Sequence, residues 1–450
     1  MNSKNSIWLF VISIIAFSIL DSCKEQRKAD INNDGGVSIV LEASIADIIR
    51  SRCTDNSDTT INKALIKSAG IKLTSKKSFA EIFVTELYKN SNNNTALSFI
   101  PRFEGLQENA SSADCLKYLL QQTDDTMEKL KQVLLRRVNK FGIENSIIQI
   151  IGNDGRILVQ LPGVAPSTRL NNLLLASGKL EFWETYDNKE IFPLLDKINK
   201  ELKNILLEKY PESIIKKIDN PLNADSSMSL SKQLSLAKSA ESDSLTVLRS
   251  LKIENPLFAV LSPAISRNEK GQSVLNNGPV VGFAAITDTG KINAYLRDTK
   301  IKSMFKPYTK FLWEFKTFRK EEYFLDLVAV DGTRGKGKAP LSGNIITEAH
   351  KVIYKKSSSP TISIRMTPDA AVVWGQLTKE NIGKSIAIVL NNCVYSYPTV
   401  QGEISGGESS ITGTFSQEEA DDFVNLLNAN SLPAKLTILQ TQVIAPLSKQ

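Results

Sequence analysis

The segment TMEKLKQVLLRRVNKFG, from Thr126 to Gly142, decides how the first half of the chain is expected to fold. Its apolar residues recur at intervals of three and four, which places them on one face of a helix. Gly142 follows as a residue that commonly ends a helix. The apolar positions are Met127, Leu130, Val133, Leu134, Val138 and Phe141. The strands around this helix define the fold class.

Strand signals lie on both sides of the helix. Residues 147–151 and 156–161 are joined across Asn153-Asp-Gly155, a typical hairpin turn. The full predicted order is strand 36–42, the helix, these two strands, helix 167–176 and strand 179–184. This strand, helix, strand, strand, helix, strand order predicts a ferredoxin-like unit.

The C-terminal third shows a second rhythm of strands and helices. Strand 361–366 leads into a helix that Thr367-Pro368 opens. Strand 385–390, a turn at Asn391-Asn392 and strand 394–400 follow, then a helix with a capping box from Ser416 to Glu419 and strand 434–439. Between the two parts, residues 188–262 are charged and Ser-rich, with a helical pattern over 193–210, and we expect a helical insertion there. Strands are expected again at 279–286 and 323–330. The fold class is therefore α+β, with two sheet units around an insertion.

The N-terminus predicts export. Lys4 is followed by an apolar run, Ile7 to Leu20, which at about 14 residues is short for a membrane span. The sequence Leu20-Asp-Ser-Cys23 is similar to a bacterial lipoprotein cleavage box, although Asp21 departs from it. Lipid attachment at Cys23, ordinary cleavage and an uncleaved anchor all place the rest of the chain outside the cytoplasmic membrane. No later stretch is expected to span a bilayer.

Composition excludes several functions. The 450 residues carry 55 basic and 48 acidic side chains, a net charge of +7, and the two signs are interspersed, so no nucleic-acid partner is expected. The four cysteines are not in CxxC spacing, which leaves no zinc motif. Cys53 and Cys115 could form a disulfide outside the cell membrane, but two buried thiols are the preferred interpretation.

Enzyme motifs are also missing. The single histidine, His350, is expected on a helix surface, so no triad or imidazole metal site is predicted. The segment Gly332 to Lys338 imitates a phosphate-binding loop, but Ala339 stands where a Ser or Thr would hold magnesium, and a solvated turn is expected. Gly406-Gly407 and Gly413 are expected to bound a strand with tight turns rather than to bind phosphate. We predict no enzyme and no cofactor.

Two smaller expectations concern single residues. Arg136-Arg137 is expected on a solvated helix face rather than in a lipid- or partner-binding patch. Phe182, Trp313 and Trp374 are expected in the core.

The order of several segments resembles the SecD family of protein translocase subunits, including the fused SecDF form. The first half of the SecD periplasmic domain resembles 133–142, Ile157-Leu-Val-Gln-Leu-Pro-Gly163 and Leu180-Glu-Phe182. The second half resembles 381–390, Tyr395-Ser-Tyr-Pro398, 404–413 and Ser431-Leu-Pro433. The residues that match its motifs are Gly35, Gly36, Arg137, Val138, Gly142, Gln160, Leu161, Pro162, Gly163, Gly383, Pro398, Gly406, Gly407, Thr412, Gly413, Leu432 and Pro433.

The resemblance implies a division of the chain and a role. The parts are a signal peptide or anchor at 1–23, the first half of a periplasmic base at 34–188, a helical and Ser-rich insertion at 189–340, a head with the return to the base at 341–436, and a stub at 437–450. The implied partners are unfolded preproteins, the SecYEG channel and SecF-like or SecD membrane proteins. The implied location is the periplasmic side of the cytoplasmic membrane, with attachment through the N-terminus.

The sequence also departs from the family. Residues 31–36 keep the two glycines of a family motif without its apolar lead, and the family's later membrane helices are not present, so we expect no proton-driven stroke from this chain alone. A tethered binding or chaperone-like paralogue and an inactive copy therefore remain alternatives. Pro398 suggests an edge strand that could hold unfolded chain, although a proline that blunts an edge against aggregation explains it equally well.

Overall fold

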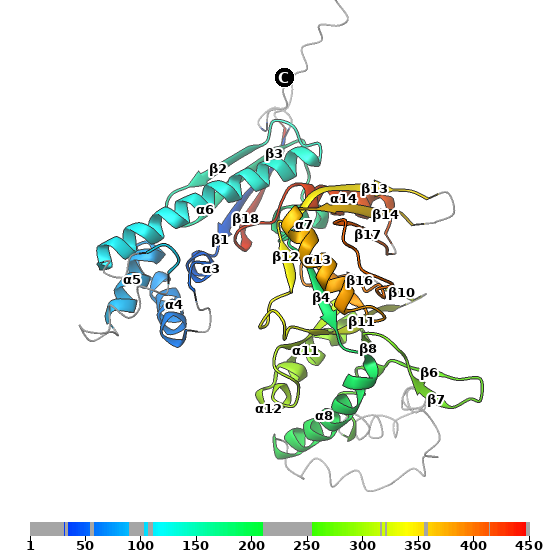
Figure 1. Cartoon of the computed structure of the whole chain (residues 1–450). Helices are drawn as coiled ribbons and strands as arrows, with labels where there is room; N and C mark the ends of the chain where they lie inside the picture. Colours follow the sequence, from blue (N-terminus) through cyan, green and yellow to red (C-terminus); the bar gives the residue numbers. More distant parts are fainter. Residues whose placement is uncertain are drawn as a thin grey trace, which may run out of the picture. The chain divides into compact units, whose positions relative to one another are not determined.

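The computed structural model describes residues 31, 35–54, 58–89, 103–106, 111–209, 254–315, 317–319, 322–354, 359–413 and 415–446. The chain is α+β, as predicted, and it divides into two compact units (Figure 1). Unit 1 comprises Met1–Ala176 and Leu432–Gln450, and unit 2 comprises Ser177–Ser431. Residues 1–30, which include Cys23 and the predicted export segment, lie outside the described residues.

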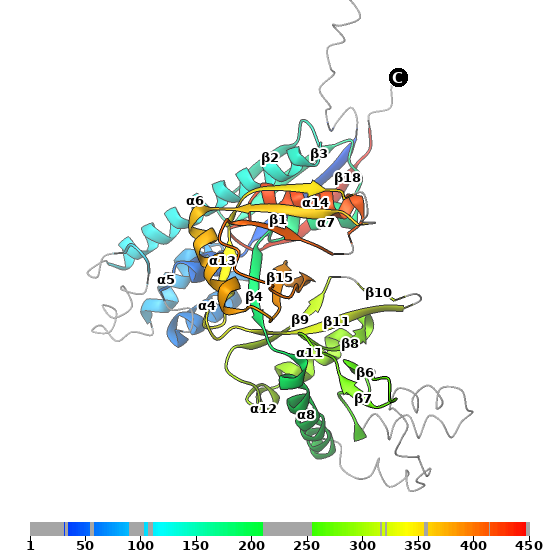
Figure 2. The same cartoon turned by 45° about the vertical axis from the view of Figure 1, so that its right-hand side comes forward.

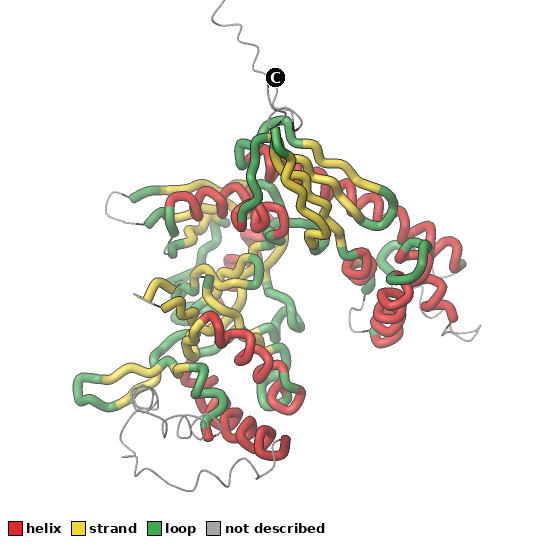
Figure 3. The backbone as a smooth tube through the Cα atoms, turned by 180° about the vertical axis from the view of Figure 1, so that it is seen from behind, coloured by secondary structure: helices red, strands yellow, loops and turns green. Residues whose placement is uncertain are grey.

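Unit 1 contains one antiparallel sheet of four strands in the order β18-β1-β3-β2. Figure 3 draws the strands of the chain in yellow and the helices in red. The strands are β1 (Gly36–Ala43), β2 (Ile147–Ile151), β3 (Arg156–Pro162) and β18 (Leu436–Ile444). The hairpin between β2 and β3 is confirmed, and Gly152 and Gly155 adopt the positive φ angles that its turn requires. The ferredoxin-like order of strands and helices is present, but its last strand is β18.

The prediction that strand 179–184 completes this sheet is wrong. Those residues form β4 (Leu180–Thr185), which pairs with strands of unit 2. The buried run Leu180, Phe182 and Trp183 suits a strand in the interior of a large sheet. The prediction of a stub after residue 436 is also wrong, because residues 436–444 pair with β1 along its length.

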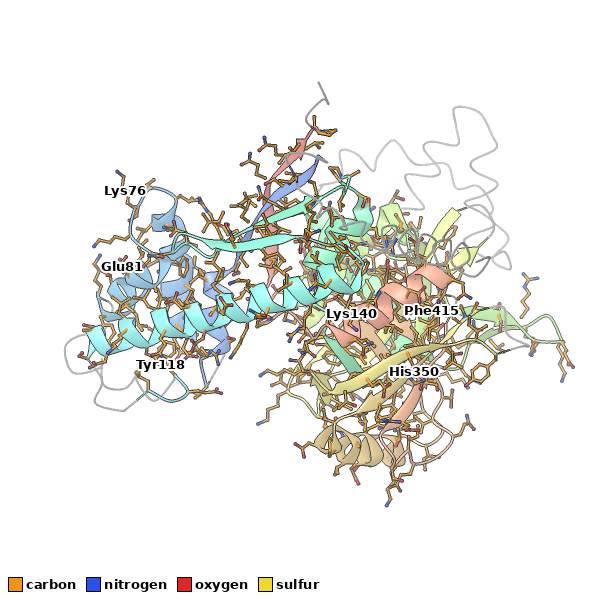
Figure 4. The ribbon with its side chains drawn as sticks, turned by 90° about the horizontal axis from the view of Figure 1, so that it is seen from above. Lys76, Glu81, Tyr118, Lys140, His350 and Phe415 are labelled. Carbon is orange, nitrogen blue, oxygen red and sulfur yellow. The ribbon has the colours of Figure 1, made fainter. Side chains whose placement is uncertain are left out.

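Helices pack on the sheet of unit 1. The long helix α6 (Ser112–Lys140) buries the predicted apolar stripe, and Gly142 follows it with a φ of +75°. The shorter helices are α3 (Ile45–Ser51), α4 (Thr59–Lys72), α5 (Phe79–Lys89) and α7 (Thr168–Leu175). Figure 4 shows Tyr118 towards the N-terminal end of α6 and Lys140 at its other end. Cys53 and Cys115 are buried in the same core without a disulfide between them, as preferred from the sequence.

Unit 2 is built on a nine-stranded sheet with the main order β12-β4-β15-β16-β9-β11-β8-β5, to which β10 adds beside β11. Its strands besides β4 are β5 (Ser262–Pro263), β8 (Val280–Ala285), β9 (Thr309–Glu314), β10 (Thr317–Arg319), β11 (Glu322–Asp331), β12 (Leu341–Gly343), β15 (Ile386–Leu390) and β16 (Cys393–Ser396). A hairpin of β6 (Ile265–Arg267) and β7 (Ser273–Leu275) stands apart from it. Figure 2 shows β4, β9, β11 and β15 within this unit.

A second sheet of unit 2 has the order β13-β14-β17, with β13 (Ile346–Val352), β14 (Thr361–Met366) and β17 (Glu408–Ile411). The helices of the unit are α8 (Asn188–Lys209), α11 (Thr289–Arg297), α12 (Thr299–Lys302), α13 (Pro368–Glu380) and α14 (Gln417–Asn428), with a 3-10 turn, η4 (Ile286–Asp288). The predicted caps at Thr367 and Ser416 are confirmed, each hydroxyl accepting a backbone N–H of its helix.

The region predicted as a helical insertion, 189–340, contains α8 but also most strands of the large sheet. Residues Leu327 to Val330 of β11 are fully buried between strands on both sides, which a helical insertion would not provide. The predicted low-complexity piece around residues 226–235 lies outside the described residues. In the part of the chain that the structure describes, no helix has both the length and the apolar character needed to cross a bilayer.

Candidate functional site

An open pocket of about 210 Å³ lies in unit 2, where three chain segments meet. The first segment follows β9, the second is β16 with the residues after it, and the third follows β17. The lining residues are Glu314, Phe315, Tyr395, Ser396, Tyr397, Pro398, Thr412, Gly413 and Phe415. Three of these, Pro398, Thr412 and Gly413, are among the family-motif residues predicted from the sequence.

The position of β16 brings these segments together. Asn391 and Asn392 have φ angles of +54° and +62°, the tight turn that the sequence predicted between β15 and β16. On its other side β16 runs parallel to β9, and the Phe315 N–H donates to the Val394 carbonyl at 2.8 Å. The prediction of an edge strand at 394–400 is therefore wrong for β16, because a strand from the middle of the chain pairs with it.

Aromatic rings form the floor of the pocket. Tyr395 stacks on Phe315 with ring centroids 4.4 Å apart and on Phe415 at 6.2 Å. Phe423 of α14 meets Tyr395 edge-on at 4.8 Å. Burial, reinforced by the nearby Cys393 and Glu419, raises the pKa of the Tyr395 hydroxyl, so this phenol stays neutral at physiological pH. The rings thus offer an aromatic surface to an apolar side chain, while Glu314, Ser396 and Thr412 supply the polar part of the lining.

A strand edge leads into the pocket. Within the described residues β17 is paired along one side only, with β14, and Thr412 and Gly413 of the pocket directly continue β17. The opposite edge of the same sheet, β13, is blocked. There the Asn428 side chain accepts from the Ala349 N–H at 2.9 Å and donates to the Ala349 carbonyl at 2.8 Å, which imitates a neighbouring strand. Among the described strands of this sheet, the β17 edge beside the pocket has no such block.

Glycines shape this edge. Gly407 has a φ of +67°, and a Cβ there would lie 2.6 Å from the Ala371 Cβ on α13. Gly413 packs against the Phe415 ring, where a Cβ would come within 2.9 Å. Gly406 has open space around it. The expected strand bounded by turns is confirmed, and nothing in this geometry resembles a phosphate loop.

The motif residues of unit 1 lie far from this pocket in the chain and serve the sheet. Gly36 pairs with Pro162, and the Gly163 N–H donates to the Gly35 carbonyl at 3.0 Å. A Cβ on Gly36 would lie 2.3 Å from the Leu161 carbonyl oxygen. The Gly-Gly and Leu-Pro-Gly motifs are therefore neighbours that allow β1 and β3 to approach closely at this end.

Arg137 contradicts the prediction of a solvated helix face, because its side chain is fully buried. Its Nη1 donates to the carbonyls of Leu173 and Ala176, at the C-terminal end of α7, where a helix favours a cation. Burial lowers the pKa of the guanidinium to about 9, which leaves it charged at neutral pH. Arg137 thus ties the end of α7 to α6.

The remaining motif residues have structural positions. Val138 is buried in the core of unit 1, Gln160 pairs with Ser38, Gly383 has a φ of +80°, and Leu432 packs against the unit 1 core beside Pro433. The pocket residues Phe315 and Phe415 were not singled out from the sequence. Phe415 precedes the capping residue Ser416, a position typical of an apolar residue that packs on the first turn, and this was the available signal.

Two segments that could suggest catalysis or phosphate binding, at His350 and at Gly332 to Lys338, have structural positions. The prediction of a helix at His350 is wrong. His350 lies on β13, because residues 346–352 pair with β14. The loop from Gly332 to Lys338 is a turn, in which Arg334 forms ion pairs with Glu184 and Glu380. Among the described residues no group of three or more His, Cys, Asp or Glu side chains is arranged to hold a metal ion. Phe182 and Trp374 are core residues whose ring centroids lie 4.7 Å apart. Trp313 is partly buried.

The comparisons with known proteins fall on the two regions just described. Residues 331–434 match the model of the SecDF P1 head subdomain, which covers the pocket apart from Glu314 and Phe315. Residues 127–187 match the N-terminal part of the P1 domain of protein translocase subunit SecDF. These two parts of the chain are thus similar to the P1 domain of SecD and SecDF protein translocase subunits.

Individual relatives agree. The protein translocase subunit SecD of Rhodothermus marinus is 29% identical over 435 residues, 96% of this chain and 64% of the relative. The subunit SecD of Calditerrivibrio nitroreducens is 40% identical over 111 residues, 25% of this chain and 22% of the relative. The chain thus spans less than two thirds of the length of these relatives. The match to a crystal structure of SecDF in a super-membrane-facing form covers 99% of this chain and 36% of the SecDF chain. Its sequence identity is 19% and its TM-score is 0.40, which supports no conclusion about the fold.

Proposed function

We propose that this chain takes part in protein translocation by holding an extended, unfolded polypeptide on the outer side of the cytoplasmic membrane. The observation that carries the proposal is the aromatic pocket directly beside the open edge of β17, within the part that matches the P1 head. The relatives are named protein translocase subunits, which supports the process. No catalytic step belongs to this function.

The geometry suits an unfolded chain of varied sequence. A segment paired with β17 gains main-chain hydrogen bonds, which do not depend on its side chains. Because Thr412 and Gly413 continue β17 into the pocket, the next residues of that segment reach the rings of Tyr395 and Phe415. One apolar side chain can then be buried there. Such a short contact is weak enough to release the polypeptide again.

The proposed partners follow from the family. They are unfolded preproteins, the SecYEG channel from which these emerge, and SecF-like or SecD membrane proteins. The proposed location is the periplasmic side of the cytoplasmic membrane, with the N-terminus, and Cys23 if it is lipidated, as the attachment. The motif residues Pro398, Thr412 and Gly413 are proposed to contact the polypeptide.

In-cell photocrosslinking tests this function. A photoreactive amino acid replaces Tyr397 in the pocket while a secretory protein is stalled in the channel. The same amino acid at Val372, which is 75% exposed on α13 and does not line the pocket, is the matched control. We expect adducts with the stalled protein and with the channel from position 397 only. Adducts with unfolded proteins but never with the channel would favour the chaperone-like paralogue, and no adducts from a folded, exported protein would refute the proposal.

A further inference from the structure

A second surface lies in unit 1, on α4 and the turn that follows it. Between Thr59 and Ala80 the sequence contains five lysines and no acidic residue. These are Lys63, Lys67, Lys72, Lys76 and Lys77. This segment precedes both regions that match the family models, 127–187 and 331–434.

The helix α4 has two different faces. Ile61, Ala64, Leu65 and Ser68 are buried against the core of unit 1. The rest of the helix surface and its C-cap residue leave large aliphatic side chains in solvent, with the C-cap Leu73 87% exposed, Ile66 72% and Ile71 40%. Leu73 is the most exposed large apolar side chain in the described part of the chain. Exposure of several aliphatic residues together on a helix usually marks a contact surface.

The charges on this side are available. Lys72 pairs with Asp154 at 2.7 Å, whereas Lys63, Lys67, Lys76 and Lys77 form no ion pair with any residue that the structure describes. The nearest following carboxylate, Glu81, accepts hydrogen bonds from the Ser78 N–H and hydroxyl, which lower its pKa, and the charges of Lys77 and Lys72 contribute less to this. Figure 4 shows Lys76 and Glu81 at the same end of unit 1 as Tyr118. We call the exposed residues Lys63, Ile66, Lys67, Ile71, Leu73, Lys76 and Lys77 the lysine–leucine face.

We propose that the lysine–leucine face docks on an anionic phospholipid surface. Lysines near such a surface attract the headgroups, while neighbouring aliphatic side chains enter the boundary of the acyl chains. A protein partner fits less well, because protein interfaces are enriched in aromatic residues and arginine and depleted in lysine. The face contains neither an aromatic residue nor an arginine. Unit 1 would thereby have a membrane contact of its own.

The test measures the environment of residue 73 in the full chain. A solvatochromic amino acid replaces Leu73, and the protein is mixed with vesicles of phosphatidylcholine alone or with an equal part of phosphatidylglycerol. The N-terminal apolar run, 7–20, is kept in every variant, so a difference at position 73 does not come from it. We expect a blue shift and protection from an aqueous quencher on the anionic vesicles only, and loss of both at high salt.

Charge variants give the matched controls. Substitution of Lys63, Lys67, Lys76 and Lys77 by Gln should lower the ratio of docked to free residue 73 by roughly several hundredfold, since each of the four lysines contributes roughly fivefold. The same charge loss in unit 2, at the exposed Lys270, Lys302, Lys336 and Lys384, should leave the ratio unchanged. Unchanged circular dichroism shows that each variant is folded.

Three results would overturn the proposal. They are an equal shift on neutral vesicles, a shift that survives the four Gln substitutions at the face, and no shift at all. A photoreactive residue at position 73 that captures a protein rather than lipid in cell membranes would assign the face to an acidic protein partner. No translocating protein enters the vesicle experiment, so its outcome is independent of the polypeptide-binding site.

Discussion

Replacing Arg137 by Met should destabilise unit 1 by about 3 kcal/mol. The Met side chain keeps the apolar stem of the arginine but removes the donors to the carbonyls of Leu173 and Ala176. A hydrogen bond from a charged donor contributes about 1.5 kcal/mol, and both carbonyls lose theirs. Removal of a buried charge by itself can be neutral or favourable, but here the two acceptors stay behind without a replacement donor. The orphaned carbonyls therefore decide the sign.

The assay must follow the two units separately. Three of the four tryptophans, Trp183, Trp313 and Trp374, belong to unit 2, so with Trp8 replaced by Phe the fluorescence during urea unfolding reports on that unit and serves as the control. Amide hydrogen exchange of peptides from α6 and α7 reports on unit 1. We expect faster exchange in both helices and an unchanged fluorescence midpoint. A loss below about 0.5 kcal/mol would refute the reasoning, because it would equal that of an ordinary surface substitution.

Three further changes have defined outcomes. Gly36→Ala should lower the free energy of urea unfolding by about 3 kcal/mol, because its Cβ would meet the Leu161 carbonyl oxygen. Gly105→Ala, also at positive φ but with open space, should lower it by only about 1 kcal/mol, and equal losses would contradict the steric argument. Asn428→Ala should open the β13 edge, cost about 2 kcal/mol and promote self-association in light scattering, while Gln417→Ala on the same helix should do neither. Burial raises the pKa of the Cys115 thiol to about 11, so below about pH 9 the thiol is neutral in both states, and as pH rises from 9 to 11 only the unfolded state ionises. Stability of unit 1 should then fall by up to about 2.7 kcal/mol, and a Cys115→Ala variant that falls equally would exclude this cause.

Local sequence patterns predicted the elements well and their partners poorly. The hairpin 147–161, the α6 stripe and the caps at Thr367 and Ser416 depend on residues close together in the chain, and all are present. The strand that closes the first sheet depends on pairing across most of the chain. Its composition did contain a signal: β18 alternates with polar residues, which suits an edge, whereas β4 has a buried apolar run.

Single residues show why the site was only partly predicted. Arg137 stands three residues after Leu134 and four after Val133, so helical periodicity placed it on the buried face, but its charge outweighed its position in the prediction. Pro398, Thr412 and Gly413 were singled out from the family resemblance. Phe315 enters the pocket through the parallel pairing of β9 with β16, and a pairing between segments about 80 residues apart leaves no local pattern.

Hydrogen exchange of the full chain with a permanently unfolded secretory protein would test the polypeptide-binding site most directly. If an extended segment adds to the open edge, the amides of Glu408–Ile411 should exchange more slowly when that protein is present, and those of β13, whose edge Asn428 already blocks, should not change. Phe415→Ala should weaken this protection by removing the pocket. Slower exchange at β13 but not at β17, or no change at either, would contradict the account.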